Sequence, residues 1–279
     1  MPARLGLPLG RFHVPDIRAE VIRRGLVASI SDTTIWRWLT EDAIKPWTHR
    51  SWIFPRDRAF GPKAARVLDL YAGEWDGRRL RDDEFVISAD EKTSIQARIR
   101  CQPTVAATAR HPMLVEHEYE RGGALAYLAA WDVHRARLFG RCEAKTGIVP
   151  FGQLVEQVMT AEPYRSARRV FWVLDNGSSH RGRAAVARLT EAYPRLVPVH
   201  LPVHASWLNQ VEIYFSILQR TVLTPAAASS LEELAARILA FQARYEGLAQ
   251  PFEWKFTRAD LSALLERLAA RSVTLPEAA

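Results

Sequence analysis

Two short apolar runs, each ending in an aspartate, constrain the fold more than any other feature of the sequence. They are residues 84–90 (EFVISAD) and residues 169–175 (RVFWVLD). Apolar runs of this length, without helical periodicity, are typical of strands buried on both faces. Neighbouring strands of such a sheet deliver their terminal side chains to one edge, so Asp90 and Asp175 can meet although they are far apart in the chain.

The segments around these runs predict a mixed α/β fold. Further strand candidates are residues 93–98, 124–132, 136–142 and 196–201, and helix candidates are residues 62–75, 151–159, 183–193, 207–222, 231–245 and 258–270. Clustered hairpin strands followed by helix-linked strands imply a mixed sheet with helices on its faces. The order is that of the ribonuclease H-like fold, and we expect a five-stranded mixed sheet.

The first 60 residues hold more than half of the net charge. The chain has 38 Lys+Arg against 31 Asp+Glu, a formal charge of +7, and ten of those bases and six of those acids lie in this segment. One helix is predicted to start at Pro15 and to close at Gly25, and Ser31 or Asp32 can cap a second. Two helices joined by a short turn are typical of a helix-turn-helix motif.

In that arrangement the second helix lies in the major groove of DNA. Its candidate DNA-binding residues are Thr33, Thr34, Arg37 and Trp38, and Lys45 and Arg50 are candidates in the basic, aromatic linker that follows. The alternative is an ordinary helical hairpin with Trp36 and Trp38 in its core. The linker could equally be a packed loop.

A third acid, Glu212, falls in the first turns of the predicted helix over residues 207–222. Three carboxylates at one edge would repel one another unless cations neutralise them, and oxygen ligands select Mg²⁺ or Mn²⁺. The expected chemistry is two-metal phosphoryl transfer, in which Asp90 bridges two ions while Asp175 and Glu212 each hold one. The alternative for each acid is a helix cap or a surface ion pair.

Residues beside these acids are candidates for supporting roles. Asn176 and His180 follow Asp175, and Asn209 precedes Glu212. His180 could reach a phosphate or simply bond the adjacent loop, and His204 and Asn209 have the same ambiguity. Strand alternation predicts that Glu91 faces away from the metals if Asp90 faces them. Lys92 is either a phosphate contact or a solvated lysine, and we expect Trp207, Tyr214, Phe215 and Leu218 to face the core.

The motifs SADEK (88–92), LDNGSSH (174–180) and LPVHASWLNQVEIYFSILQR (201–220) resemble those of a known family. They are similar to the DDE transposases of bacterial insertion sequences, in the insertion sequence 630 branch of the mariner-like superfamily. The resemblance runs from about Phe12 to Thr257. It implies that Asp90, Asp175 and Glu212 are the catalytic carboxylates.

The same resemblance implies the substrates and the assembly. The N-terminal helices would bind the terminal inverted repeats of an element, and the enzyme would cut both strands and join 3′-hydroxyls to a TA-containing target. Double-stranded DNA is thus the expected partner, and a homodimer is expected because two element ends must be joined. Two alternative hypotheses for the function are an inactive or truncated remnant that only binds DNA, and a ribonuclease H-like nuclease that acts on another nucleic acid.

We expect four regions along the chain. Residues 1–60 form the DNA-binding region and linker, 61–82 a connecting helix, 83–225 the catalytic domain and 226–279 C-terminal helices packed on it. Family members often carry two helix-turn-helix units, so the N-terminus looks shortened. Two cysteines, no signal peptide and no apolar stretch of ~20 residues favour a cytoplasmic protein without a membrane span. The basic stretch 98–121 is a candidate contact for DNA or a partner.

Overall fold

A computed structural model describes residues 2–41, 55–225 and 227–274 of the chain. It divides into two compact units, Met1–Phe54 and Pro55–Ala279. None of the described helices is long and apolar enough to cross a membrane.

The N-terminal unit is built on two helices, α1 (Val14–Arg23) and α2 (Asp32–Glu41), which pack against each other. Ser31 caps α2 because its Oγ accepts a hydrogen bond from the backbone N–H of Thr34 at 3.1 Å. Ile35 is buried, whereas Trp36 and Trp38 are 53% and 51% exposed. The alternative that placed both tryptophans in a helical core is therefore wrong, because their faces of α2 point to solvent within this unit.

The second unit begins with α3 (Phe60–Tyr71), which is followed by a small hairpin of β1 (Glu74–Trp75) and β2 (Arg78–Arg79). The helix predicted to reach Trp75 ends earlier because Gly73 adopts a φ of 78°. Asp76 and Gly77 both have positive φ, as a tight two-residue hairpin turn requires. The hairpin presents two successive arginines.

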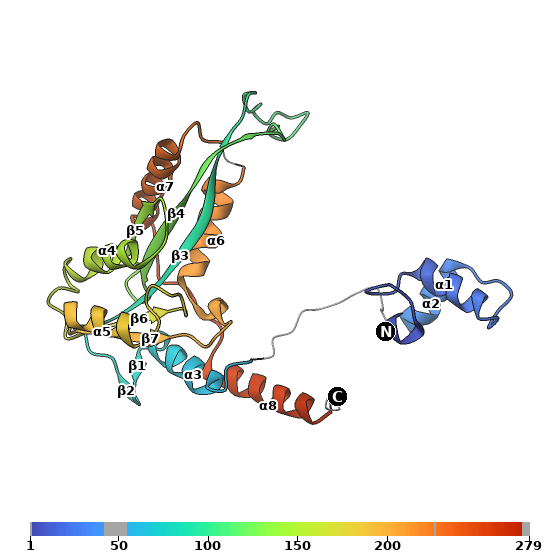
Figure 1. The fold of residues 1–279 in the computed structure, drawn as a ribbon, viewed down its shortest axis with the longest axis horizontal. Coiled ribbons are helices and arrows are strands. Elements are labelled where there is room, and N and C mark those ends of the chain that lie inside the picture. The colour runs from blue at the N-terminus through green and yellow to red at the C-terminus, as the bar shows by residue number, and fades with distance from the viewer. Residues whose placement is uncertain (1, 42–54, 226, 275–279) are drawn as a thin grey trace. The chain divides into compact units, whose positions relative to one another are not determined.

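A five-stranded mixed sheet forms the centre of this unit, as predicted (Figure 1). The strands lie in the order β5 (Leu138–Glu143), β4 (Glu120–Asp132), β3 (Glu84–Ile99), β6 (Arg169–Leu174) and β7 (Leu196–His200). Strands β3, β4 and β5 pair antiparallel, whereas β6 is parallel to β3 and β7 is parallel to β6. The antiparallel half and the parallel half meet at β3.

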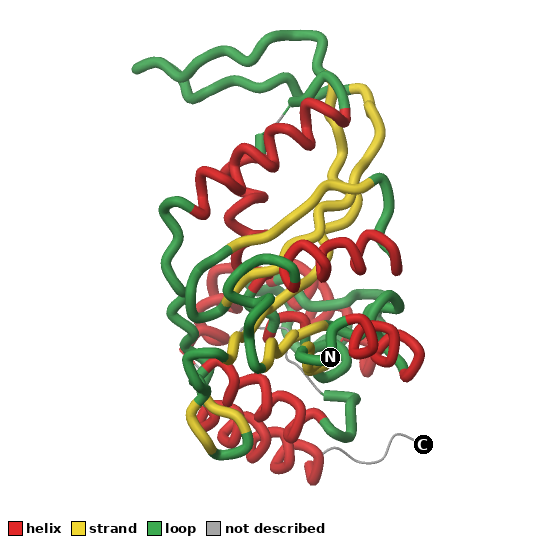
Figure 2. Tube along the Cα trace, turned by 90° about the vertical axis from the view of Figure 1, so that its left-hand side faces the viewer, coloured by secondary structure: helices red, strands yellow, loops and turns green. Residues whose placement is uncertain are grey.

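Strand β3 unites the two predicted strands 84–90 and 93–98. A bulge between Lys92 and Ile95, where Ser94 has a φ of 57°, absorbs the polar residues that interrupt the apolar pattern. Strands β3 and β4 extend beyond the rest of the sheet as a two-stranded ribbon (Figure 1). The chain between them forms a long loop, closed by bridges between Val105 and Leu114 and between Thr108 and His111 (Figure 2).

Helices cover both faces of the sheet. One face packs against α3, α6 (Val211–Leu218) and α7 (Leu231–Glu246), and the other against α4 (Ile148–Met159) and α5 (Arg183–Ala192). Helix α8 (Arg258–Thr274) packs against α3. Helix α6 starts later than predicted because a 3-10 turn occupies Ser206–Leu208, and a π-helical turn, Gln219–Leu223, follows it. Tyr214, Phe215 and Leu218 are buried, which confirms the predicted core stripe, and Trp207 packs partly buried against it.

Candidate active site

Strand register brings Asp90 and Asp175 to the same level of the sheet. The last parallel pair of β3 and β6 is Ser88 with Val173. Asp90 and Asp175 each follow two residues later, so the same register places them side by side. Strand β6 stops at Leu174, and the chain turns away at Asp175. Asp90 is 8% exposed within β3, whereas Asp175 is half-buried.

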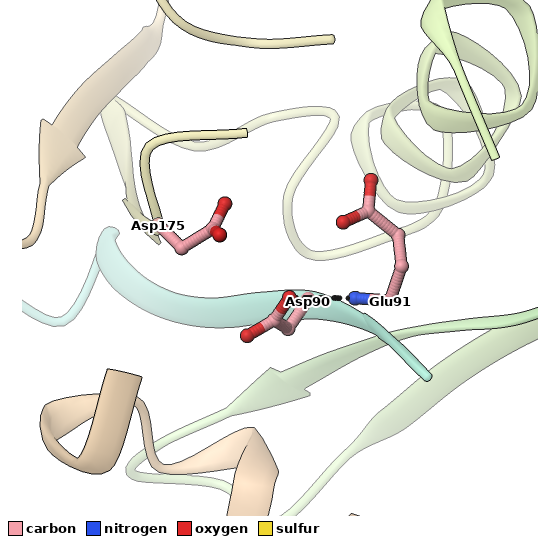
Figure 3. Close-up of side chains that lie close together, drawn as sticks. All are labelled: Asp90, Glu91 and Asp175. Carbon is pink, nitrogen blue, oxygen red and sulfur yellow. Dashed lines mark hydrogen bonds between the residues drawn. The ribbon is translucent and has the colours of Figure 1, made fainter. Parts of the chain in front are cut away.

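Three carboxyl groups gather at this point (Figure 3). Asp90, Glu91 and Asp175 can each offer one oxygen such that the three oxygens lie within 4.8 Å of one another. A set of carboxylate oxygens at this spacing suits a hard divalent cation such as Mg²⁺ or Mn²⁺. The donor set therefore fits the metal that the sequence predicts.

The electrostatics of the cluster also favour a cation. Burial, aided by the negative charges of Asp175, Glu91 and Glu212, raises the pKa of Asp90 to about 7. Burial also raises the pKa of Glu91. Asp175 differs, because a hydrogen bond from His180 lowers its pKa. Carboxylates crowded in a partly desolvated edge are costly to ionise together, and a bound cation would remove that cost.

Asn209 holds Asp90 in place from the chain that leads into α6. Its Nδ2 donates to Asp90 Oδ2 at 3.1 Å and to the carbonyl of Ala89 at 3.0 Å. Its Oδ1 accepts a hydrogen bond from Ser88 Oγ, which in turn accepts from the N–H of Val211 at 2.9 Å. Asn209 and Ser88 are both buried, so these bonds are shielded from water and fix the start of α6 against β3.

His180 performs the corresponding task for Asp175. Its Nε2 lies 2.6 Å from Asp175 Oδ1, which also accepts the N–H of Gly177 at 2.8 Å. On its other side, Nδ1 lies 3.0 Å from Ser179 Oγ, and that hydroxyl donates to Glu91 Oε1 at 3.3 Å. His180 is fully buried and packs against Phe151 of α4. A connected chain of polar groups thus joins Glu91 to Asp175.

The expectation that Glu91 stands apart from the site is wrong. Side chains do alternate between the two faces along β3. Asp90 lies on the face of Val86, which packs toward α6, and Glu91 lies on the face of Ala89, which packs toward α4. However, β6 has already ended at this level, and the loop from Asp175 to His180 folds over the α4 face. The longer glutamate side chain therefore meets that loop at the open edge of the sheet.

Glu212 is near the cluster without joining it. Glu212 lies on the first turn of α6 and is exposed as a residue. Partial desolvation of its carboxyl group and the negative charge of Asp175 raise its pKa, whereas the positive charge of Lys92 lowers it. The three oxygens within 4.8 Å come from Asp90, Glu91 and Asp175. The structure thus brings two of the three predicted carboxylates together and leaves the third within electrostatic reach.

The remaining candidates have different surroundings. Asn176 donates to the carbonyl of Leu201 at 2.9 Å, which ties the 175–180 loop to the end of β7. His204 is exposed with a φ of 62°. Within the N-terminal unit, Thr33, Arg37 and Trp38 are exposed on α2, and Thr34 Oγ1 is bonded to Ser31 Oγ. Lys45 and Arg50 lie outside the described residues.

Four residues that shape the site are absent from the ligands and supports that the sequence predicts: Ser88, Glu91, Ser179 and His200. Ser88 and Glu91 share the SADEK motif with Asp90, and this position is the signal that could have marked them. Ser179 donates to Glu91, and Nε2 of His200 lies 3.0 Å from the carbonyl of His180. These partners are distant in the chain, so no local pattern points to Ser179 or His200.

Comparison with known proteins gives a family and a fold. The family model described as "DDE superfamily endonuclease" matches residues 86–235, which is more than half of the chain. No curated protein matches. Solved structures of similar fold include the Mos1 mariner paired end complex with Mn, at 13% identity and a TM-score of 0.55, which covers 96% of this chain and 80% of that one.

Two further structures agree with this match. The Mos1 strand transfer complex is similar at 12% identity and a TM-score of 0.52, over 96% of this chain and 79% of that one. The Mos1 paired end complex with Mg is similar at 14% identity and the same TM-score, over 96% and 80% of the two chains. At these identities the likeness establishes the mixed α/β fold.

Proposed function

The chain belongs to the DDE superfamily of endonucleases, and on that premise we propose that it is a transposase. Its substrate would be double-stranded DNA at the terminal inverted repeats of a mobile element. The reaction would be metal-dependent cleavage followed by transfer of the free 3′-hydroxyl into TA-containing target DNA. The meeting of the Asp90, Glu91 and Asp175 carboxyl groups at the open edge of the sheet is the observation that carries this proposal.

The cofactor would be two divalent ions, Mg²⁺ or Mn²⁺, the metals named for the Mos1 complexes of similar fold. Asp90 and Asp175 would hold them, and Glu212 would complete the set from α6. Glu91 is a further oxygen donor within reach. When bound, such ions lower the pKa of the attacking water or hydroxyl and stabilise the leaving oxygen.

The protein's own contribution is to hold these carboxylates still. Asn209 orients Asp90 by donating to Oδ2, and His180 orients Asp175 at Oδ1. Both supporting side chains are buried and bonded on their far sides as well, so neither can swing freely. Supporting bonds of this kind fix the orientation and charge of metal-binding groups.

DNA recognition would belong to the N-terminal unit and to the extended ribbon. The exposed residues Thr33, Arg37 and Trp38 on α2 suit contact with a groove or with phosphates. Thr34, Lys45 and Arg50 complete the proposed contact set. The loop between β3 and β4 would reach DNA or a second copy of the chain, and a homodimer would hold the two element ends together.

The proposal is tested by neutral substitution of the carboxylates. We expect Asp90→Asn, Asp175→Asn and Glu212→Gln each to reduce Mg²⁺-dependent cleavage of a labelled terminal-repeat duplex by at least 10²-fold. Gel-shift binding to the same duplex should change little, since binding rests on groups elsewhere. Glu253→Gln, which removes an exposed acid from the segment before α8, is the matched control and should cleave like the wild type.

Each outcome discriminates between functions. Full cleavage by any of the three variants would contradict the assignment of that residue. A wild-type chain that binds the repeat but never cleaves it with Mg²⁺ or Mn²⁺ would favour the alternative, an inactive remnant that only binds DNA. Glu91→Gln belongs in the same series, because its loss of activity would show that the fourth carboxylate takes part in the reaction.

A further inference from the structure

We infer that a basic groove along the outer edge of β7 and the β1–β2 hairpin binds the phosphate backbone of the DNA that lies in the active site. The inference rests on the proposed function and adds to the catalytic unit a second DNA contact, which runs from the active-site end of β7 to the opposite end of the sheet.

The first cavity, of about 420 Å³, lies between α3 and β7. Its lining includes Arg66 of α3, Lys63 of α3, which is paired with Asp57 at 2.8 Å, the four residues 197–200 of β7, and Trp75. The second, of about 470 Å³, lies at the hairpin and also includes Trp75. Trp75 borders both cavities, so they adjoin at this residue, and we take the two together as one track from His200 along β7 to the hairpin.

The active-site end of this track is fixed by a hydrogen bond. His200 Nε2 lies 3.0 Å from the carbonyl of His180, the residue that orients Asp175. The far end lies level with Glu84, where β3 begins. From Glu84 to Asp90 the strand advances about 20 Å at ~3.3 Å per residue. A duplex of about six base pairs spans that length, since each strand of B-DNA places one phosphate per ~3.4 Å of helix axis.

The far end is strongly basic. Five arginines and two acids line the hairpin cavity: Arg78, Arg79, Arg81, Arg168 and Arg169 against Asp76 and Glu84. Glu84 is buried and paired with Arg169 at 2.6 Å, so its charge is neutralised within the fold. Arg81 pairs with Asp83 at 3.5 Å.

Three arginines of the two cavities are left without an acidic partner among the described residues. Arg66, Arg78 and Arg79 are exposed and form no ion pair with any residue that the structure describes. The Arg66 guanidinium lies over the ring of Trp75 at 5.2 Å, and Trp75 is itself packed on Phe171 of the core. A guanidinium held by stacking keeps its N–H donors directed outward, which suits phosphate oxygens.

An extended, open track with unpaired guanidinium groups favours a polyanion over a small ligand. DNA phosphates are spaced along such a track, and each arginine that neutralises one releases counterions, so affinity depends on salt. A contact of this kind would position the duplex without reading its sequence.

The test measures salt dependence with the full chain. Fluorescence anisotropy of a labelled terminal-repeat duplex is recorded across a range of salt concentrations for the wild type and for Arg78→Gln/Arg79→Gln. The slope of log K against log salt is negative, and we expect the double variant to reduce its magnitude by about 2, equally for repeat and unrelated duplexes. Arg66→Gln alone should lower it by about 1, which provides a second variant if the hairpin fails to fold.

The matched control is Arg244→Gln/Arg267→Gln, which removes two exposed arginines from α7 and α8. This control should keep the wild-type slope. Hairpin and Arg66 variants that keep the wild-type slope, while the wild type binds and cleaves normally, would overturn this inference and leave the proposed function standing. A wild type that binds no DNA would overturn both.

Discussion

At the scale of single residues, the site is organised as two carboxylates, each held by a buried polar neighbour. Asn209 donates to Asp90, and His180 bonds to Asp175. The two arrangements have opposite effects on charge, because burial raises the pKa of Asp90 whereas the bond from His180 lowers that of Asp175. Asp175 is therefore ionised near neutral pH, whereas Asp90 needs a neighbouring cation to favour its ionised form there.

The raised pKa of Asp90 predicts a pH-dependent stability of the metal-free protein. Its folded pKa of about 7 lies above the ordinary value of 3.8, so the folded state binds the proton more tightly. The contribution of Asp90 to the free energy of unfolding should therefore fall as pH rises from about 4 to about 7, by on the order of 4 kcal/mol at 1.36 kcal/mol per pKa unit. Above pH 7 the buried charge persists as a destabilising feature.

Asp90→Asn removes this charge, so in EDTA at pH 8 the variant should melt at a higher temperature than the wild type. The gap should shrink by pH 5, where Asp90 is protonated in the folded state. Millimolar Mg²⁺ at pH 8 should raise the melting temperature of the wild type more than that of the variant. An equal gap at both pH values would contradict the buried charge of Asp90.

At the scale of elements, the close approach of α7 to the sheet depends on a glycine. Gly140 of β5 lies under the hydroxyl of Tyr127, which donates to Gln242 Oε1 of α7 at 2.8 Å. A Cβ at Gly140 would lie 2.4 Å from the tyrosine oxygen and 2.6 Å from that amide oxygen. The small residue therefore makes room for a polar contact between strand and helix.

Gly140→Ala should lower the free energy of unfolding by about 1–3 kcal/mol, because a rigid, buried tyrosine must move. Urea denaturation followed by circular dichroism measures the change. Gly152→Ala is the control within α4, since a Cβ there meets nothing within 4 Å and alanine is the better helix former by up to ~1 kcal/mol. A Gly140→Ala variant as stable as Gly152→Ala would show that Tyr127 and α7 can shift away from residue 140 without a loss of stability.

Strands β3 and β4 show what local patterns can and cannot predict. The apolar run 84–90 correctly marks a buried strand, and the run 124–132 marks most of its partner. The sequence predicts two strands, 84–90 and 93–98, separated at Glu91 and Lys92, whereas cross-strand pairing carries β3 without interruption through a bulge to Ile99. Pairing with a distant segment outweighed the local polar sequence.

At the scale of the whole molecule, the chain consists of two compact units with separate tasks in the proposed function. The N-terminal unit would recognise the repeat, and the second unit would cut. Arg37→Ala should therefore weaken binding to the terminal repeat in a gel-shift titration, by roughly 1–3 kcal/mol if Arg37 contacts a base. Arg4→Ala, an exposed arginine of the same unit outside α2, is the control.

The stabilisation of the second unit by Mg²⁺ should be the same in Arg37→Ala as in the wild type. Unchanged binding of the repeat by Arg37→Ala would show that α2 does not recognise DNA as proposed. Loss of the Mg²⁺ effect in that variant would show that the two tasks are not separable.

The sequence by itself determined the mixed sheet, the strands that carry Asp90 and Asp175, and their meeting at one edge. These properties follow from local hydrophobic patterns and from the geometry that every such sheet shares. Tertiary structure alone decided that Glu91 joins the carboxylates and that Glu212 stays outside the group of three, and it showed which carboxylate each of the candidate supports Asn209 and His180 contacts. Those contacts depend on where β6 ends and how the 175–180 loop folds over β3, and such long-range placement leaves no periodic signal in the chain.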